Sequence, residues 1–359
     1  MKFAFTDEQL ELRRGARRFL DKHSSATAVR KVMDTELGYD PAVWKQISEE
    51  LGWSALIIPD EYDGVGLGYV ELVALMEEMG RALLCSPFFS TVCLGANALL
   101  LAADDSQKKR WLPGIAAGTT TATLALTDET EMSVAHTDDG YVLTGTKTFV
   151  VDGHSADLLI VADGIDLYVV PADTDGVSRE LLPTMDQTRR LARVSLDNVT
   201  VPGHSKLNGA SDVLPRILDL ACIALSAEQV GGAERCLELS VDYAKTRTQF
   251  GKPIGSFQAI KHKCADMLTM VESARSASYW AGWAASVDDD ELTFAAPLAK
   301  ATCSDAYFSC AAEAIQIHGG VGFTWECDVH LYFKRAKSSE SLLGAPAHHR
   351  EQLAKRMDW

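Results

Sequence analysis

The sequence predicts an α+β fold in which a helical segment, a β segment and a second helical segment follow one another. Apolar residues recur at helical spacing as far as residue 118, whereas short runs rich in β-branched residues fill residues 119–212. Long stretches rich in alanine and leucine fill residues 213–359 and indicate a helical bundle. We therefore expect three domains with these boundaries: residues 1–118, 119–212 and 213–359.

Local start signals support helices in the first segment. Thr6, followed by Gln9, has the spacing of a capping box ahead of an apolar stripe. Asp40 and Pro41 place a cap and a first-turn proline before a second apolar repeat. The glycine-containing residues 59–66 then have the composition of a turn. Without a preceding parallel strand they do not predict a phosphate-binding loop.

Turn dipeptides separate the short apolar runs of the second segment. Asp139-Gly140 and Asp152-Gly153 are two of them, and no helical repeat lies between the runs. Strands of this length and spacing are typical of an antiparallel barrel or sandwich. The expected strands are residues 121–126, 141–144, 148–151, 158–162, 167–170 and 194–201.

Three long helices are expected in the third segment, because each stretch is apolar on more than one side and must pack against neighbours. Pro215 precedes the first stretch, in agreement with a proline in the opening turn of a helix. A C-terminal four-helix bundle accommodates helices of this kind. The three expected helices are residues 217–243, 257–286 and 292–317.

The composition excludes several classes of partner. The 359-residue chain carries a formal net charge of −16, which disfavours nucleic acid and anionic membranes as main partners. Its longest apolar stretches are far shorter than the roughly 20 residues needed to cross a bilayer. Acidic Asp7 interrupts the start of the sequence, so no signal peptide is readable and we expect a cytoplasmic protein.

The cysteines and histidines do not predict a metal site. The 8 cysteines include no CxxC pair, so we expect buried, reduced thiols. No cluster of His, Cys and carboxylate residues has metal-ligand spacing. The adjacent His348 and His349 would point to different sides of a helix, so they do not form a ligand pair.

Four collinear motifs carry a family resemblance that covers nearly the whole chain. Residues 247–254, RTQFGKPI, followed by 257–260, FQAI, resemble the RxxFGxxI…xQ signature of the acyl-CoA dehydrogenase superfamily. Residues 316–323, QIHGGVGF, resemble its QxxGGxGF signature. Residues 59–66, PDEYDGVG, and 107–114, QKKRWLPG, are similar to a turn of the family and to the end of its first helical domain. The resemblance implies an acyl-CoA dehydrogenase-like fold, an oligomer and an FAD cofactor.

The two C-terminal motifs have the chemistry that a flavin dinucleotide requires. Arg247 offers a planar, permanently charged group to a pyrophosphate. Gly319 and Gly320 allow backbone to approach a phosphate or ribityl chain, and Phe250 supplies a stacking face. A surface arginine at a helix end and a simple glycine turn are the alternative interpretations. By resemblance, the residues that reach flavin held mainly by a neighbouring subunit are Arg247, Gln249, Phe250, Gln258, Gln316, Ile317, Gly319 and Gly320.

The family reaction is α,β-dehydrogenation of an acyl-CoA thioester, in which a glutamate removes the Cα proton and flavin accepts the hydride. By resemblance, that glutamate lies at one of two positions, which Leu343 and Ala221 occupy here. Neither side chain accepts a proton, so the catalytic base is unknown. Glu228, two helical turns beyond Ala221, is the substitute candidate, and its alternative role is a buried or interfacial carboxylate.

The β segment also departs from the family pattern. The family's TEPGAGSD loop corresponds to residues 127–132, TDETEM, in which the glycine-serine part is shortened. The Trp and Thr that flank the flavin ring in the family become Phe149 and Val151. The half of the site that is offered to a neighbour is therefore retained, whereas the half that this chain keeps is altered.

These departures resemble the heteromeric α2β2 branch of the superfamily, in which one subunit type carries the base and a homologous partner completes the flavin site. The resemblance implies a heterotetramer that desaturates an acyl-CoA in steroid or other lipid catabolism, with an acceptor of the electron-transfer flavoprotein type. This chain would be the subunit that lacks the usual glutamate. A self-sufficient homo-oligomeric dehydrogenase with an atypical base and a flavin-free structural homologue are the alternatives.

Overall fold

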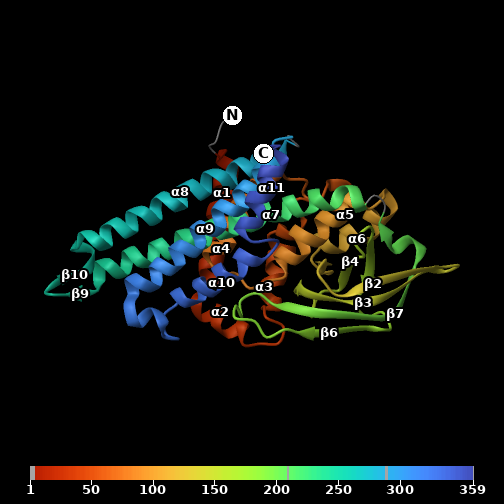
Figure 1. Ribbon diagram of the computed structural model, residues 1–359, viewed down its shortest axis with the longest axis horizontal. Coiled ribbons are helices and arrows are strands. Elements are labelled where there is room, and N and C mark those ends of the chain that lie inside the picture. Colours follow the sequence, from red (N-terminus) through yellow and green to blue (C-terminus); the bar gives the residue numbers. More distant parts are fainter. Residues whose placement is uncertain (1–4, 208–209, 288–289, 359) are drawn as a thin grey trace. The chain divides into compact units, whose positions relative to one another are not determined.

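The computed structural model (Figure 1) describes residues 5–207, 210–287 and 290–358. The chain divides into two compact units, and each is described by itself. The helical unit comprises the chain up to Arg30, Tyr69–Leu84 and the chain from Cys222 onward. The sheet unit comprises Lys31–Gly68 and Cys85–Ala221. The three domains expected from the sequence stay a prediction.

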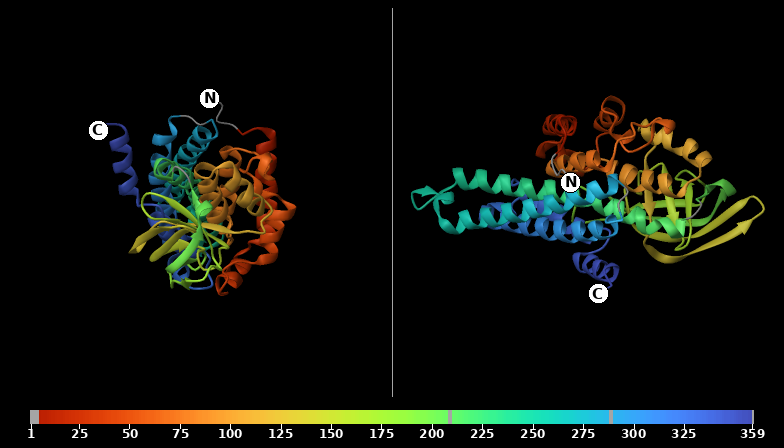
Figure 2. Two further views of the ribbon diagram at one scale, coloured as in Figure 1. Left: turned by 90° about the vertical axis from the view of Figure 1, so that its right-hand side faces the viewer. Right: turned by 90° about the horizontal axis from the view of Figure 1, so that it is seen from above.

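Helices packed along one another form the helical unit. Its helices are α1 (Asp7–His23), α4 (Tyr69–Arg81), α8 (Gln258–Ser286), α9 (Leu292–His318), α10 (Val329–Ser341), α11 (Pro346–Arg356) and the short η6 (Ile254–Ser256) and η7 (Gly319–Phe323). Two further helices, α2 (Ala26–Met33) and α7 (Ala210–Thr246), have residues in both units. α8 lies along α9, and α9 also contacts α10 and α11 (Figures 1 and 2). The predicted C-terminal helical domain is confirmed.

Glycines allow α4 and α7 to cross at close range. A Cβ on Gly80 would lie 1.9 Å from the carbonyl oxygen of Glu228, and one on Gly231 would lie 1.8 Å from that of Glu77. No side chain fits at such a separation, so both positions need a residue without a Cβ. The crossing brings Glu228 of α7 into the interior of the helical unit, where it is buried.

A buried ionic cluster ties α1 and α8 to α4. Glu77 and Glu78 of α4 are both buried, although an isolated carboxylate is costly to remove from water. The Glu78 carboxylate accepts hydrogen bonds from Arg13 Nε at 2.8 Å and Arg17 Nε at 2.7 Å. Glu77 accepts from Arg13 Nη2 and from the Tyr279 hydroxyl, each at 2.7 Å. These pairings compensate the desolvation of the two charges and orient three helices.

The described residues of the sheet unit form short helices and eight strands. The helices are α3 (Pro41–Lys45), η1 (Gln46–Glu50), η2 (Trp53–Ala55), η3 (Asp60–Tyr62), η4 (Phe89–Ala96), α5 (Asn97–Ala102), α6 (Asp105–Ala116) and η5 (Gly203–Ser205). The strands are β1 (Ala122–Ala125), β2 (Asp128–Thr137), β3 (Gly140–Val151), β4 (Leu158–Ala162), β5 (Leu167–Pro171), β6 (Val177–Leu181), β7 (Leu191–Pro202) and β8 (Lys206–Leu207).

The eight strands form two separate four-stranded sheets rather than a closed barrel. One sheet has the order β1-β4-β5-β8 and the other β2-β3-β7-β6. Leu159 and Val161 of the first sheet share one apolar core with Leu143, Val194 and Val199 of the second. The predicted sandwich is therefore the form observed. The expectation of purely antiparallel pairing is wrong at one place, because β1 pairs with β4 in parallel.

The local sequence signals correspond closely to the observed elements. Both hydrogen bonds of the capping box at Thr6 are present, and the Asp40 carboxylate accepts from the N–H of Ala42 at 2.9 Å. The expected runs 141–144 and 148–151 belong to the single strand β3. Pro215 lies inside α7, which begins earlier, at Ala210, instead of opening the helix.

Three further observations concern membranes, metals and thiols. None of the helices in the described part of the chain is long and apolar enough to cross a membrane. The same described residues contain no group of three or more His, Cys, Asp or Glu side chains arranged to hold a metal ion. The cysteines are free thiols, and six of them are buried.

Candidate flavin-contact site

A tight β-hairpin connects α7 to α8 and carries the first predicted flavin motif. Its strands are β9 (Thr248–Gln249) and β10 (Lys252–Pro253), joined by Phe250 and Gly251. The carbonyl of Arg247 accepts a hydrogen bond from the N–H of Ile254 at 2.8 Å, which closes the hairpin at its base. The predicted contacts Arg247 and Gln249 are both exposed on this hairpin.

Phe250 holds an unusual conformation at the tip of the hairpin. Its φ is 51° and that of Gly251 is 76°, as a two-residue turn between twisted strands requires. Glycine adopts a positive φ freely, but a bulky aromatic residue there is strained. The Phe250 side chain is nevertheless 91% exposed and meets Phe257 only edge-on, with ring centroids 6.2 Å apart. The packing of this chain does not explain a strained and exposed ring, which is typical of a contact site.

The end of α9 carries the second predicted motif. Gln316 is exposed in the last turn, and Gly319 ends the helix with a φ of 64°. A Cβ built on Gly319 or Gly320 would meet no atom of this chain within 4 Å. Gly320 also lies outside the left-handed region, so the fold of this chain does not itself require glycine there. The bare backbone at Gly320 fits the approach of a group from outside the chain.

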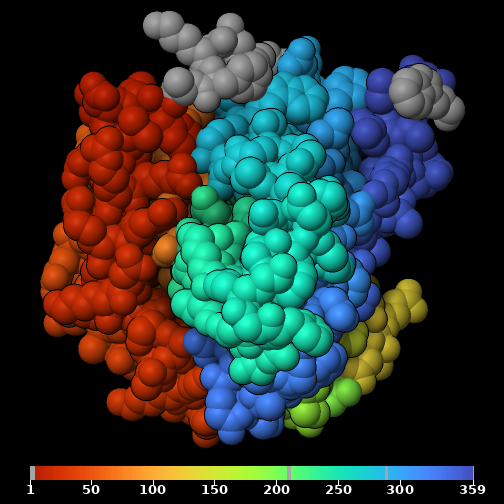
Figure 3. Space-filling model, turned by 90° about the vertical axis from the view of Figure 1, so that its left-hand side faces the viewer, coloured from red at the N-terminus to blue at the C-terminus, as the bar shows by residue number. Residues whose placement is uncertain are grey.

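A ring stack joins the two motifs. His318 stacks on Tyr243 of α7, with centroids 4.3 Å apart and planes inclined by 22°. The Tyr243 carbonyl accepts the N–H of Arg247 at 2.8 Å, so the stack lies one helical turn from the hairpin. Both segments belong to the helical unit and lie at the end that faces the viewer in Figure 3. The structure therefore brings Arg247 and Gln316 to one end of this unit.

The remaining predicted contacts divide between surface and interior. Gln258 is exposed in the first turn of α8. Ile317 is buried, because it lies on the inner side of α9 while Gln316 lies on the outer side. A cofactor contact from position 317 would therefore have to come from its backbone.

An exposed apolar rim adjoins the glycine pair, and its residue Trp325 lies outside the motif read from the sequence. Phe323 is 80% exposed, and Trp325 is 57% exposed in the loop between α9 and α10. Lys334 Nζ lies 4.2 Å from the Trp325 ring centroid, and the His330 ring meets it edge-on at 4.8 Å. The available signal for Trp325 was its place two residues after Phe323, directly beyond that motif.

The turn that carries Leu343 is held firmly, although it lacks a carboxylate. Leu343 has a φ of 59° between α10 and α11. Nε2 of buried His349 donates to its carbonyl at 2.9 Å. The ammonium of buried Lys300 donates to the carbonyls of Ser339 at 3.0 Å and Gly344 at 3.2 Å. The other expected position, Ala221, is fully buried within α7.

Glu228, the substitute candidate for the base, is engaged in a buried ion pair. Its Oε1 accepts a hydrogen bond from Arg335 Nη1 at 3.1 Å, and both residues are buried. A buried charge pair of this kind holds α7 and α10 together, so removing either member is destabilising. The geometry favours the structural role for this carboxylate.

The altered loop of the sheet unit is an acidic strand. Residues 127–132 place Asp128, Glu129 and Glu131 on the exposed edge strand β2. Asp128 Oδ1 lies 2.5 Å from Nζ of buried Lys147, and Glu129 Oε2 lies 2.7 Å from Arg193 Nε. The hydrogen bond from Arg193 lowers the pKa of Glu129, which keeps that carboxylate ionised. A pyrophosphate at this strand would meet carboxylates, two of them already ion-paired, instead of a glycine-serine loop.

The two positions that flank the flavin ring in the family differ in exposure. Phe149 has a φ of 55° at an irregularity of β3, and its side chain is 59% exposed. Val151 is buried and offers neither a donor nor an acceptor from its side chain. The sheet unit thus presents a flat ring surface without the hydroxyl partner.

Comparison with known proteins identifies the family. Residues 6–119 match the model for the acyl-CoA dehydrogenase N-terminal domain, and residues 209–358 match that for the C-terminal domain. The chain is 38% identical to the acyl-CoA dehydrogenase IpdE2 of Mycolicibacterium smegmatis, over 97% of each protein. This chain belongs to the acyl-CoA dehydrogenase family. Members of that family bind FAD.

Solved structures agree with this membership. The crystal structure of the ChsE4-ChsE5 complex from Mycobacterium tuberculosis matches with a TM-score of 0.93 and 28% identity, over 100% of this chain and 99% of that one. Butyryl-CoA dehydrogenase from Megasphaera elsdenii matches with a TM-score of 0.92 and 26% identity over 100% of both chains. The Tcur3481-Tcur3483 steroid ACAD matches with a TM-score of 0.89 and 29% identity over 98% of both chains.

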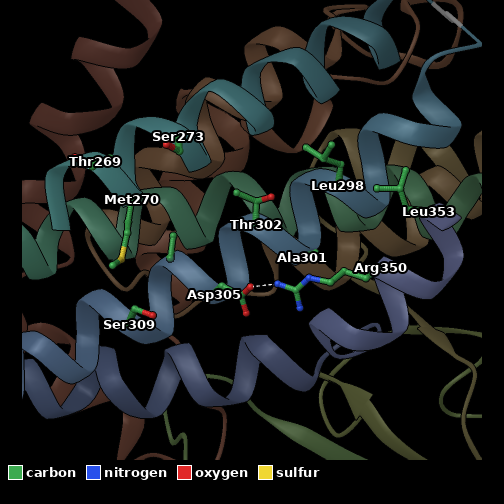
Figure 4. A pocket seen from close by; sticks show the side chains of 11 residues that line it. Thr269, Met270, Ser273, Leu298, Ala301, Thr302, Asp305, Ser309, Arg350 and Leu353 are labelled. Carbon is green, nitrogen blue, oxygen red and sulfur yellow. Dashed lines mark hydrogen bonds and ion pairs between the residues drawn. The ribbon is translucent and has the colours of Figure 1, made fainter. Parts of the chain in front are cut away.

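A separate groove of about 510 Å³ lies between α8, α9 and α11 (Figure 4). Small side chains such as Ala301, Thr302 and Ser309 line it, and an ion pair joins Asp305 to Arg350 among the lining residues. None of the predicted flavin contacts lines this groove. It therefore does not belong to the candidate site.

Proposed function

We propose that this chain is the subunit of a heteromeric FAD-dependent acyl-CoA dehydrogenase that clamps flavin seated on a homologous partner and does not supply the catalytic base. One contrast carries the proposal. The exposed contacts offered to a neighbour are retained, whereas hydrocarbon side chains occupy both usual base positions, Leu343 and Ala221.

The exposed residues Arg247, Phe250, Gln316 and Gly320, which we call the clamp, fit the chemistry of the cofactor. Arg247 places a permanent charge on an exposed hairpin, where it would neutralise a pyrophosphate. The Phe250 ring has a free face for stacking, and the open backbone at Gly320 accepts a close approach. Gln316 supplies an amide that donates and accepts hydrogen bonds. Bound FAD would supply the hydride-accepting chemistry of the family.

The sheet unit supports a division of labour. Asp128, Glu129 and Glu131 stand where relatives keep a glycine-serine loop, so this chain's own sheet unit offers a pyrophosphate carboxylates, two of them ion-paired, in place of that loop. Glu228 is tied to Arg335, which favours a structural role for the substitute candidate. A partner that carries the glutamate and most of the flavin pocket would account for both the altered loop and the engaged Glu228. The similarity to a chain of the ChsE4-ChsE5 complex, which contains two different proteins, supports a second polypeptide as the partner.

Within the complex, this chain binds and orients rather than transfers protons. Arg247 and Gln316 fix the dinucleotide, and Phe323 and Trp325 exclude water from the edge of the contact. The proton acceptor comes from the partner subunit. The similarity to a steroid ACAD supports a steroid-derived acyl-CoA as the substrate, and the resemblance to the family supports an acceptor of the electron-transfer flavoprotein type.

Flavin content tests the proposal. The chain is produced alone and together with a homologous partner, and FAD per chain is measured from its visible absorbance. We expect almost no FAD in the chain alone, and about one FAD per two chains in the complex. Turnover of acyl-CoA is expected only in the complex. A homo-oligomer that binds one FAD per chain and oxidises acyl-CoA by itself would contradict the proposal.

Substitution of Arg247 tests the clamp, and substitution of Arg350 is the matched control. Arg247→Ala in this chain should raise the FAD dissociation constant of the complex by about 10- to 100-fold, because it removes a charge-assisted contact. Arg350→Ala removes an exposed arginine outside the clamp and should leave the constant unchanged. Equal constants for the wild type and Arg247→Ala would show that Arg247 does not hold the flavin and would contradict the proposal.

A further inference from the structure

The two halves of the flavin clamp come from distant parts of the sequence and must be held in register. Arg247 follows α7, whereas Gln316 and the glycine pair lie at the end of α9. Backbone hydrogen bonds within a helix do not determine where its end lies relative to the end of a neighbour. Side-chain contacts between the two ends have to do so.

The stack of His318 on Tyr243 is such a contact. His318 lies two residues after Gln316 and directly before Gly319, and Tyr243 is bonded through its carbonyl to the N–H of Arg247. Face-to-face separation of 4.3 Å with a 22° inclination leaves little freedom for one helix end to slide past the other.

The orientation of the His318 ring is itself determined. Nδ1 lies 2.8 Å from the carbonyl oxygen of Ala314, one turn earlier in α9. Because a carbonyl only accepts hydrogen bonds, Nδ1 carries the hydrogen, and Nε2 of the neutral ring is an acceptor. Burial lowers the pKa of His318 from its usual value, so the ring is neutral at neutral pH. A rigid, uncharged ring is thereby presented to Tyr243.

We infer that His318 is a positioning residue for the flavin clamp, which acts through Tyr243 to hold the Arg247 hairpin and the Gly319–Gly320 backbone at a common distance from the cofactor. The inference rests on the proposed function and deepens it. Neither ring needs to touch FAD. The two rings instead determine the distance between the Arg247 hairpin and the Gly319–Gly320 backbone, which contact the cofactor.

The expected effect is on flavin affinity more than on folding. An aromatic pair contributes about 0.5 to 1.5 kcal/mol, which corresponds to about a 2- to 12-fold change in an equilibrium constant. The stack lies at the end of the helical unit, so its loss leaves the ionic cluster and the helix crossings intact. His318→Leu should therefore raise the FAD dissociation constant of the complex by about 5- to 10-fold.

Conservative variants separate stacking from packing. His318→Phe keeps a flat ring but loses the bond to Ala314, and should stay within about threefold of the wild type. Tyr243→Leu should match His318→Leu, and the double variant should be no weaker than either single variant, because both remove one interaction. The control is Phe308→Leu, which disrupts the Phe308–Phe333 ring pair, 5.5 Å between centroids, ten residues earlier in α9.

The experiment measures FAD binding to the complex by flavin fluorescence and the Tm of this chain without flavin. Phe308→Leu should lower Tm and leave the FAD dissociation constant unchanged, whereas His318→Leu should raise the constant and lower Tm no more than Phe308→Leu does. An unchanged constant for His318→Leu, or a constant for His318→Phe as high as for His318→Leu, overturns the inference. If Arg247→Ala is also without effect, the proposed function itself fails. If Arg247→Ala weakens binding while His318→Leu does not, only the positioning role fails.

Discussion

Replacing Glu228 by glutamine distinguishes a structural from a catalytic role for this carboxylate. Glutamine keeps the size of the side chain and removes its charge. The Arg335 guanidinium, 3.1 Å away and 2% exposed, would then keep a buried charge that has lost this ion-pair partner. Breaking a buried ion pair by removing one member costs about 3 to 5 kcal/mol. We expect Glu228→Gln to destabilise the chain by this order.

The effect is measured as a shift of the thermal unfolding midpoint. Each kcal/mol lowers Tm by about 2 °C in a chain of this size, so Glu228→Gln should lower it by about 6 to 10 °C. Adding Arg335→Met should recover most of the loss, because an apolar side chain needs no counter-charge. Circular dichroism of the helical signal follows the transition. Glu340→Gln is the control, since its partner Lys337 is half exposed and the loss should be below about 2 °C.

Turnover of the co-expressed complex decides between the two roles. If Glu228 is structural, complexes of Glu228→Gln, assayed well below its Tm, retain most of their acyl-CoA oxidation. A variant that unfolds at the wild-type temperature and abolishes oxidation would refute the structural role and make Glu228 the base.

Three further predictions concern the clamp and the turn at Leu343. Gly320→Ala should leave Tm unchanged, since the new Cβ meets no atom of this chain, and should weaken FAD binding about tenfold, since that Cβ would face the cofactor. The control is Gly203→Ala, whose new Cβ is equally unobstructed and which should leave FAD binding unchanged. Phe250→Ala should weaken FAD binding about 2- to 12-fold by removing the exposed ring, as titration of the complex would reveal. Burial lowers the pKa of His349 from 6.5 to about 4. Between pH 4 and pH 6.5, His349 therefore binds a proton in the unfolded chain but not in the folded chain. Stability should therefore be full above pH 6.5 and fall by about 2 to 3 kcal/mol as the pH drops to 4; His349→Gln should remove this part of the slope in Tm against pH, and an unchanged slope would contradict it.

The strands β2 and β6 were not predicted from the sequence. Both strands are mostly exposed and polar, so they lack the alternation of apolar residues that predicts a strand. Backbone pairing to β3 and β7 makes them strands, and that pairing depends on the neighbour rather than on their own side chains. The parallel pairing of β1 with β4 has the same origin, because the chain passes through the other sheet between them.

The candidate site divides in a similar way. Its motifs were readable because the residue types needed by a dinucleotide lie close together within 247–258 and 316–320. The exposure of Trp325 and the engagement of Glu228 by Arg335 were not readable. Both depend on partners or surroundings that lie far away in the sequence.

The sequence by itself determined the helix starts at Thr6 and Asp40, because periodicity and caps act over a few residues. It also determined the family, through motifs that keep the same order along the chain. Only the tertiary structure decided that Ile317 is buried while Gln316 is exposed, that Glu228 meets a charge 107 residues away, and that His318 stacks on Tyr243. Burial and pairing arise from contacts between distant segments, and those contacts exist only once the helices have packed.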